Sequence, residues 1–211
     1  MTLPSQERNQ KEAMTFNHDP AAEIVTAVVA ACWIVFGGIF MLGKSGAATA
    51  ETKRAGRFSP GLLLQCLGYA VCFALYRIYF SPLFPMSKQT EAILALATIF
   101  IAIGSIWFCL AAVRTLGKQW ALVARVVDGH ELITQGPYGI VRNPIYLGMF
   151  GLLLATGLAV SRWQALLAGI ALFLIGNELR IRSEEKLLVE AFGKKFDDYV
   201  RRVPAFFPRI F

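Results

Sequence analysis

The sequence is short of charged residues, and this shortage excludes most soluble folds. Only 17% of its 211 residues are charged, whereas 56% are hydrophobic; an ordinary soluble domain has about 25% charged residues. Disordered chains are excluded because the apolar content is too high. A disulfide-stapled secreted module is excluded because the four cysteines show no paired spacing. The mean hydropathy of +0.53 indicates instead a protein of the lipid bilayer.

Metal chemistry also has little support in the sequence. There are two histidines, neither of which stands at ligand spacing from a cysteine, and no C-x-x-C motif occurs. A structural or catalytic zinc site needs three or four such ligands together. We therefore expect no metal, and we interpret the cysteines as apolar packing residues. They are Cys32, Cys66, Cys72 and Cys109.

Three apolar runs are long enough to cross a bilayer, which requires roughly 20 helical residues. They cover residues 21–42, 60–80 and 92–113. The last of these runs contains no charged residue at all. We expect three membrane-spanning helices in this part of the chain.

Two shorter apolar runs follow, at 145–160 and 163–176. Only Ser161 and Arg162 separate them, and this tight connection predicts a helical hairpin in the membrane. A buried hairpin at the interface is the alternative. Small residues let membrane helices approach closely, and the two runs contain Gly148, Gly151, Gly157 and Gly169.

The end of the chain is charged but patterned. Its apolar residues recur at helical spacing opposite Lys194 and Lys195, which predicts an amphipathic helix on the membrane surface. These residues are Leu188, Phe192, Phe196 and Tyr199. The predicted fold is an all-α integral membrane protein with about five transmembrane helices, the last two forming the short hairpin, followed by this C-terminal helix. It divides into a polar N-terminal tail (1–20), a three-span membrane region (21–113) and a third region (114–211).

The distribution of basic residues predicts the orientation. With five spans and the amino terminus outside, most Lys and Arg residues fall in the first loop, the third loop and the C-terminal tail. By the positive-inside rule, the third loop and the tail are cytoplasmic. The formal net charge of +7 suits anionic membrane lipids, and no basic tract or known fold indicates nucleic acid.

Polar motifs gather in the two segments that this orientation brings to one side. Gly136-Pro137-Tyr138 is typical of a turn, and Asn143 followed by Pro144 is typical of a helix start with Asn143 as its cap. A helix start presents free N–H groups to an anion. The same residues also suit a plain junction between a loop and a helix.

A second polar cluster lies just after the predicted hairpin. Arg180 and Glu184 are four residues apart and so share a helix face, as do Glu178 and Arg182, whose order is the more favourable for a stabilising pair. Charged residues at this position suit a polar cavity at the membrane interface. A solvated helix face accounts for them equally well.

Together these motifs resemble a family. The similarity covers residues 115–211 and is to the isoprenylcysteine carboxyl methyltransferases and the related phospholipid methyltransferases. It rests on Leu116-Gly117, Trp120, His130, Gly136-Pro137-Tyr138, Val141-Arg142-Asn143-Pro144, Tyr146, Arg180, Glu184-Glu185, Leu188, Phe192-Gly193, Tyr199, Arg202-Val203-Pro204 and Pro208. The first three spans match only in hydropathy.

The resemblance implies an integral membrane enzyme that transfers a methyl group from S-adenosyl-L-methionine. It implies catalytic roles for Arg180 and Glu184, with Arg180 also holding the substrate. The cofactor-binding residues that it implies are His130, Glu131, Leu132, Ile133, Tyr138, Asn143, Pro144, Ile145, Tyr146 and Glu184.

The expected reaction is carboxyl O-methylation of an isoprenylcysteine-like substrate that enters from the bilayer. A carboxylate is already ionised at neutral pH and needs no strong base, and Arg180 offers it a planar fork of donors. The family commonly has histidine where this chain has Asn143. Asparagine does not titrate, so methylation of a neutral amine or thiol would need another base.

Three alternatives stay open. The segment from Arg142 to Tyr146 also resembles the Arg-x-Pro-x-Tyr segment of NADPH-dependent membrane sterol and steroid reductases. A phospholipid or thiol methyltransferase differs only in the acceptor. The third alternative is a membrane scaffold without enzymatic activity, in which the polar cluster does not bind a small molecule.

Overall fold

The chain is almost entirely helical in the part that the computed structural model describes. The described residues are 20–42, 53–54, 59–77, 83, 87–117, 125–126 and 132–208. The predicted tail at 1–20 therefore lies outside them, apart from Pro20. The helices are α2 (Pro20–Leu42), α3 (Pro60–Ala74), α4 (Lys88–Leu116), α5 (Pro144–Val160), α6 (Trp163–Phe192) and α7 (Lys194–Arg202), with a short 3₁₀ helix η2 (Gly136–Gly139).

Three of these helices are long and apolar enough to cross a membrane. The candidate membrane spans are Ala21–Ile39, Lys88–Leu116 and Trp163–Phe192. Among the described residues, the run at 60–80, predicted as a spanning helix, is helical only over Pro60–Ala74. Helices α3 and α5 are thus apolar but shorter, with 15 and 17 residues. The predicted end of the last run at residue 176 is wrong, because α6 continues without a break to Phe192. The charged second half of α6 is rich in Glu, Leu and Arg, which are strong helix formers.

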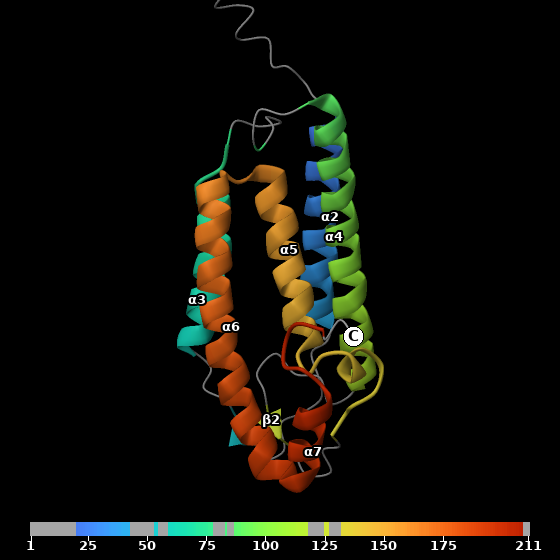
Figure 1. The fold of residues 1–211 in the computed structure, drawn as a ribbon, viewed down its shortest axis with the longest axis vertical. Coiled ribbons are helices and arrows are strands. Elements are labelled where there is room, and N and C mark those ends of the chain that lie inside the picture. Colours follow the sequence, from blue (N-terminus) through green and yellow to red (C-terminus); the bar gives the residue numbers. More distant parts are fainter. Residues whose placement is uncertain are drawn as a thin grey trace, which may run out of the picture.

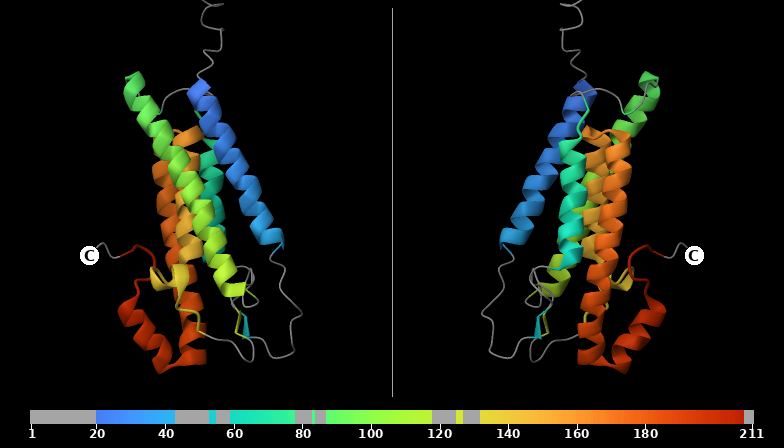
Figure 2. Two further views of the ribbon diagram at one scale, coloured as in Figure 1. Left: turned by 90° about the vertical axis from the view of Figure 1, so that its right-hand side faces the viewer. Right: turned by 90° about the vertical axis from the view of Figure 1, so that its left-hand side faces the viewer.

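The five long helices α2 to α6 lie side by side and alternate in direction (Figures 1 and 2). Helices α2, α4 and α6 descend in Figure 1, while α3 and α5 ascend, so that η2, α7 and the C-terminal segment lie at the lower end. The two-residue strands β1 (Lys53–Arg54) and β2 (Arg125–Val126) pair antiparallel. This ladder joins the connection after α2 to the one after α4.

Backbone contacts at glycines decide which helices pair. A Cβ atom added to Gly176 of α6 would lie 2.5 Å from the Gly61 carbonyl oxygen of α3, and one added to Gly169 would lie 2.9 Å from the Gly68 carbonyl oxygen. Only glycine allows backbones so close. Helix α6 thus packs mainly against α3, and α5 packs mainly against α4.

This pairing differs from the simple hairpin expected for the last two spans. Helices α5 and α6 are joined by Ser161 and Arg162 as predicted, but only Gly157 of the four predicted glycines faces the other helix, where it meets Leu166. Gly148 and Gly151 face Ser105 of α4. The hydropathy of a run does not tell which neighbour its glycines meet.

An arginine closes the far end of α5, at the top of Figure 1. The Arg77 guanidinium donates hydrogen bonds to the carbonyl oxygens of Leu158, Ala159 and Ser161 over 2.6 to 2.8 Å. The backbone of Tyr76 forms a β-bridge with Ser161. The carbonyl groups at this helix end are therefore bonded within the protein.

The predicted C-terminal amphipathic helix is two helices, and its apolar side faces the protein. Gly193 has a φ of 51°, a left-handed conformation that ends α6 and starts α7. Phe196, Tyr199 and Val203 are buried in a small apolar cluster. Their partly buried neighbours are Leu132, Leu188, Phe192 and Val200. The expected membrane-facing stripe is therefore an internal core.

Candidate functional site

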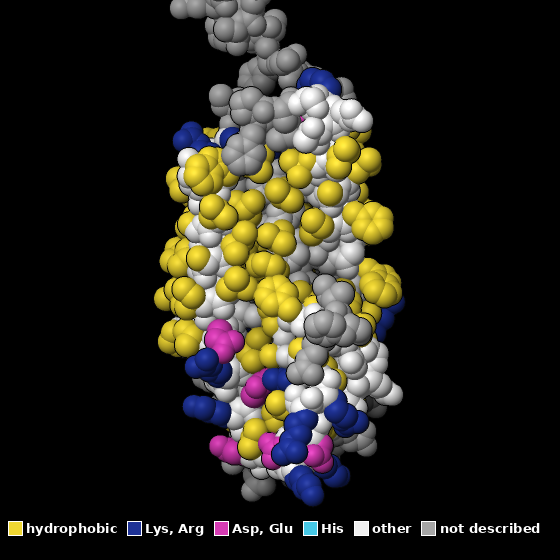
Figure 3. Space-filling model, in the orientation of Figure 1, with side chains coloured by type: hydrophobic (Ala, Val, Ile, Leu, Met, Phe, Trp, Pro, Cys, Tyr) yellow, Lys and Arg dark blue, Asp and Glu magenta, His cyan; other side chains and the backbone are white. Residues whose placement is uncertain are grey.

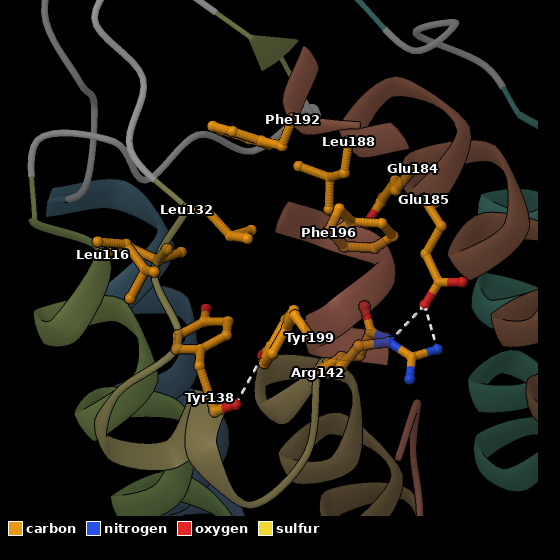
Figure 4. Close-up of a pocket in the computed structure, with 12 residues that line it drawn as sticks. Leu116, Leu132, Tyr138, Arg142, Glu184, Glu185, Leu188, Phe192, Phe196 and Tyr199 are labelled. Atoms are coloured by element: carbon orange, nitrogen blue, oxygen red, sulfur yellow. Dashed lines mark hydrogen bonds and ion pairs between the residues drawn. The ribbon is translucent and has the colours of Figure 1, made fainter. Parts of the chain in front are cut away.

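A pocket lies at the lower end of the bundle, between the end of α4, the segment around η2, the charged half of α6, and α7 (Figure 4). The empty space within it, counted out into the open mouth, is about 530 Å³. The lining residues are Leu116, Leu132, Ile133, Tyr138, Arg142, Asn143, Glu184, Glu185, Leu188, Phe192, Phe196 and Tyr199.

The pocket has an apolar side and a polar side. Figure 4 shows Leu116, Leu132, Leu188 and Phe192 around one part of the space. The carboxylates and the arginine of the lining come together in another part. Such a pocket suits a ligand that combines a flat apolar group with charged or hydroxyl groups.

Glu184 is the acceptor at the centre of a polar cluster. Its Oε1 atom accepts hydrogen bonds from the Tyr146 hydroxyl and from Nη2 of Arg180, the latter over 3.2 Å. Among the described residues, no hydrogen bond to its Oε2 atom is found. The guanidinium carbon of Arg180 also lies 4.9 Å from the centre of the Tyr146 ring. The predicted pairing of Arg180 with Glu184 on one helix face is confirmed.

A second ion pair joins the pocket to the C-terminal segment. Arg142 donates from Nε and Nη2 to Oε1 of Glu185, over 2.9 and 2.7 Å, and its side chain is 9% exposed. Its Nη1 atom donates to the Val203 carbonyl oxygen, and its backbone N–H donates to the Pro204 carbonyl oxygen over 2.8 Å. Arg142 therefore holds α6 and the segment after α7 against the loop before α5.

Asn143 does not cap α5 with its side chain, so that prediction is wrong. Its ψ of 62° differs from the extended backbone that cap residues usually have. Its side-chain amide instead donates to the Ala205 carbonyl oxygen over 2.9 Å, and its backbone N–H donates to the same oxygen. Asn143 thus helps to fix the C-terminal segment.

Two tyrosines close the pocket on the side of α7. The Tyr199 hydroxyl donates to the Tyr138 carbonyl oxygen over 2.6 Å. Burial raises the pKa of Tyr199 to about 12, and burial also raises the pKa of Tyr138. Both hydroxyl groups therefore stay protonated at neutral pH, and Tyr199 remains a donor.

The structure brings together part of the predicted site. Leu132, Ile133, Tyr138, Asn143 and Glu184 line the pocket, as the resemblance implied. The other predicted residues in the described part of the chain lie outside the lining: Tyr146 and Arg180 contact Glu184 from behind, and Pro144 and Ile145 belong to the start of α5. His130 and Glu131 lie outside the described residues.

Sequence reasoning left part of the lining out of the site. These residues are Leu116, Arg142, Glu185, Leu188, Phe192, Phe196 and Tyr199. All of them belong to the motifs that carry the resemblance or to the apolar pattern after residue 187. That pattern was the available signal, but it indicates an apolar face without telling what covers it. Within the described ranges, no three His, Cys, Asp or Glu side chains are arranged to hold a metal ion.

The sequence is similar to a known protein family and to several curated proteins. Residues 92–195 match the phospholipid methyltransferase family. The chain is 42% identical over 98 residues to the nickel-cobalt-cadmium resistance protein NccN of Alcaligenes xylosoxydans xylosoxydans, covering 46% of this chain and 45% of the relative. It is 37% identical over 105 residues to the cobalt-zinc-cadmium resistance protein CzcN of Cupriavidus metallidurans, covering 47% and 46%.

The matches thus span about half the length of these two relatives. A longer match is to a probable protein-S-isoprenylcysteine O-methyltransferase of Oryza sativa, with 32% identity over 133 residues that cover 61% of this chain and 68% of the relative. The family match over residues 92–195 includes the pocket-lining residues from Leu116 to Phe192. The chain therefore belongs to the isoprenylcysteine carboxyl methyltransferase family, which is related to the phospholipid methyltransferases.

Proposed function

We propose that this protein is an integral membrane methyltransferase that uses S-adenosyl-L-methionine to methylate a lipophilic acceptor. The proposed reaction is carboxyl O-methylation of an isoprenylcysteine-like substrate. The observation that carries the proposal is the placement of Glu184 at the pocket wall, with Arg180 bonded to it from behind. Membership in the family supports the same reaction class.

The residues of the pocket fit this cofactor. Leu132 and Ile133 offer apolar contacts for an adenine ring, and the Oε2 atom of Glu184 is an acceptor for ribose hydroxyls or an ammonium group. Arg142 is held by Glu185 and by the C-terminal segment, so it serves mainly to shape the pocket. The remaining predicted contacts, which include His130, Glu131, Tyr138, Asn143, Pro144, Ile145 and Tyr146, stay part of the proposal.

S-Adenosyl-L-methionine, when bound, supplies a methyl group on a positively charged sulfur. The chain itself has to hold the acceptor and exclude water. Arg180 uses one N–H of Nη2 for Glu184, and its planar fork has further donors for a substrate carboxylate. Because such a carboxylate is ionised at neutral pH, the reaction needs positioning more than it needs a base.

The acceptor reaches Arg180 from the bilayer in this proposal. Hydrophobic side chains cover the middle and upper part of the face shown in Figure 3, and charged side chains gather towards its lower end. On α6, the apolar residues Ile175 and Leu179 are exposed just before Arg180. An isoprenoid chain lying along this surface would bring its polar end to the level of Arg180.

We further propose that all five helices from α2 to α6 cross the membrane, including the shorter α3 and α5. The pocket end then faces the cytoplasm, because the connections at that end carry most of the basic residues. We expect membrane lipids to surround the hydrophobic middle and upper part of the helix bundle.

Calorimetric binding of S-adenosylhomocysteine and of NADPH to the purified protein in detergent tests the cofactor. We expect micromolar binding of S-adenosylhomocysteine alone, lost in Glu184→Ala and retained in Glu178→Ala, whose side chain pairs with Arg182 outside the pocket. Binding of NADPH alone would identify a reductase instead. Binding of neither ligand by folded protein would favour a scaffold.

Transfer of a labelled methyl group then tests the acceptor. The acceptors to compare are an S-farnesylcysteine with a blocked amino group, phosphatidylethanolamine and methanethiol. We expect labelling of the farnesylcysteine carboxylate, since Arg180 matches its charge and geometry. Labelling of the phospholipid or the thiol alone would support methyltransferase activity but contradict the proposed carboxylate substrate.

A further inference from the structure

Gln65 is a buried amide on α3 that the proposed reaction does not yet use. Its side chain is 1% exposed and accepts a hydrogen bond from Nη1 of Arg180 over 3.3 Å. Its own Nε2 atom donates to Oδ1 of Asn177 on α6, also over 3.3 Å. Asn177 is 2% exposed. Burying two amides among membrane helices is unfavourable unless they are hydrogen-bonded, and here each one is.

The close approach of α3 and α6 sets the position of this amide. Gly61 and Gly176 meet one turn before Gln65 and Arg180 on their respective helices. A Cβ atom on Gly176 would lie 2.9 Å from the backbone nitrogen of Gln65, and one on Gly61 would lie 2.7 Å from Cγ of Arg180. The glycines therefore make room for the stem of Arg180 and bring Gln65 within reach of its head.

Arg180 is held from three directions. Gln65 bonds Nη1, Glu184 bonds Nη2, and the Tyr146 ring lies against the guanidinium. Two of these contacts come from the region that matches the family, residues 92–195, whereas Gln65 lies outside it. The third contact is thus supplied by a helix that the family match does not include.

We propose that Gln65, oriented by Asn177, is a positioning residue that directs the Arg180 fork towards the acceptor carboxylate. This inference rests on the proposed function, because it assumes that Arg180 binds a carboxylate. An arginine side chain loses considerable rotamer freedom when it is ordered. Because the Gln65 amide already holds Nη1 in the free protein, Arg180 loses less conformational entropy when the acceptor binds.

The test compares the affinity of the purified protein for an S-farnesylcysteine with a blocked amino group and for its methyl ester. A contact to the carboxylate strengthens binding of the acid relative to the ester. General damage to the apolar surface weakens binding of both compounds equally. We expect wild-type protein to prefer the acid, Arg180→Leu to lose the preference, and Gln65→Met to lower it by about three- to tenfold. Methionine keeps the length and the unbranched shape of glutamine.

Binding of S-adenosylhomocysteine to each variant serves as the readout of an intact pocket. We expect Gln65→Met to change it by less than about twofold. Thr98→Val is the matched control, because Thr98 is 2% exposed and its only hydrogen bond within the described residues goes to the Leu94 carbonyl of its own helix. It should leave the acid preference unchanged.

If Gln65→Met does not fold, Asn177→Leu provides the second variant, since it removes the partner that orients Gln65. A folded variant of either kind with the wild-type acid preference overturns the inference alone. Wild-type protein that binds S-adenosylhomocysteine but prefers neither acid nor ester overturns the inference and the carboxylate acceptor together. Wild-type protein that does not bind S-adenosylhomocysteine overturns the proposed function at the cofactor.

Discussion

The guanidinium of Arg180 lies against the face of the Tyr146 ring, with its central carbon 4.9 Å from the ring centre. Both side chains also donate to the same oxygen of Glu184. Tyr146 therefore contacts Arg180 through its ring and Glu184 through its hydroxyl. The two contacts are separable by mutation, because phenylalanine retains the ring.

Tyr146→Phe should weaken the binding of S-adenosylhomocysteine by roughly five- to tenfold, since Glu184 loses one of the donors that orient it. The measurement is calorimetry on the detergent-purified variant. Tyr69→Phe is the control, because the Tyr69 hydroxyl bonds the Met149 carbonyl oxygen away from the pocket. Equal affinities of Tyr146→Phe and wild type would show that this hydroxyl does not support the cofactor site.

Arg142→Ala should release the segment that follows α7. The substitution removes the ion pair with Glu185 and the bond to the Val203 carbonyl oxygen, and hydrogen bonds to a charged group contribute about 1.5–3 kcal/mol. We expect the amide hydrogens of residues 196–206 to exchange about tenfold faster or more, measured by mass spectrometry.

The control for Arg142→Ala is Arg182→Ala. Arg182 pairs with Glu178 on an exposed face, and such pairs contribute only about 0.3–0.5 kcal/mol. Its exchange pattern over residues 196–206 should equal that of wild type. Unchanged exchange in Arg142→Ala would mean that the apolar cluster around Phe196 holds the segment by itself.

Gly176→Ala should destabilise the bundle. The new methyl group would lie 2.5 Å from the Gly61 carbonyl oxygen, so α3 and α6 would have to move apart, at a cost of about 1–3 kcal/mol. We expect a lower midpoint of thermal unfolding in detergent. Gly104→Ala on α4, where nothing lies within 4 Å of the added atom, should leave the midpoint unchanged or raise it. An unchanged midpoint in Gly176→Ala would argue against close packing of α3 and α6.

Labelling with a membrane-impermeant thiol reagent should place the two ends of α6 on opposite sides of the membrane. Arg162 and Lys194 are exposed at those ends. We expect Arg162→Cys to react in intact cells and Lys194→Cys to react only after the membrane is permeabilised. Unmodified wild type controls for the native cysteines. Reaction of both variants in intact cells would contradict the proposed orientation.

The apolar runs predicted where the helices begin, because burial in lipid or protein requires continuous apolar sequence, but they did not predict the ends of α3 at Ala74 and of α6 at Phe192. The pairing of helices was not predictable in the same way. A run that is apolar on all sides has no periodicity to show which face meets which neighbour, so Gly169 was assigned to a hairpin although it meets Gly68.

In the candidate site, too, contacts between residues close in the sequence were predictable, whereas contacts between distant residues were not. The pair of Arg180 and Glu184 was predictable from their spacing on one helix, and so was the exposed pair of Glu178 and Arg182. The partners of Arg142 and Asn143 lie 43 to 62 residues further along the chain, and no local pattern indicates them. In the sequence, Gln65 is one polar residue in an apolar run, and its contact with Arg180 of α6 has no local signal.

At the far end of α5, a side chain provides the hydrogen bonds that water provides at an exposed helix end. In water, the last carbonyl groups of a helix are hydrated, but hydrocarbon offers them no donor. Arg77 brings three hydrogen bonds to that end from the segment that follows α3. These three carbonyl groups therefore need no donor from the surroundings of the helix end, whether those surroundings are water or lipid.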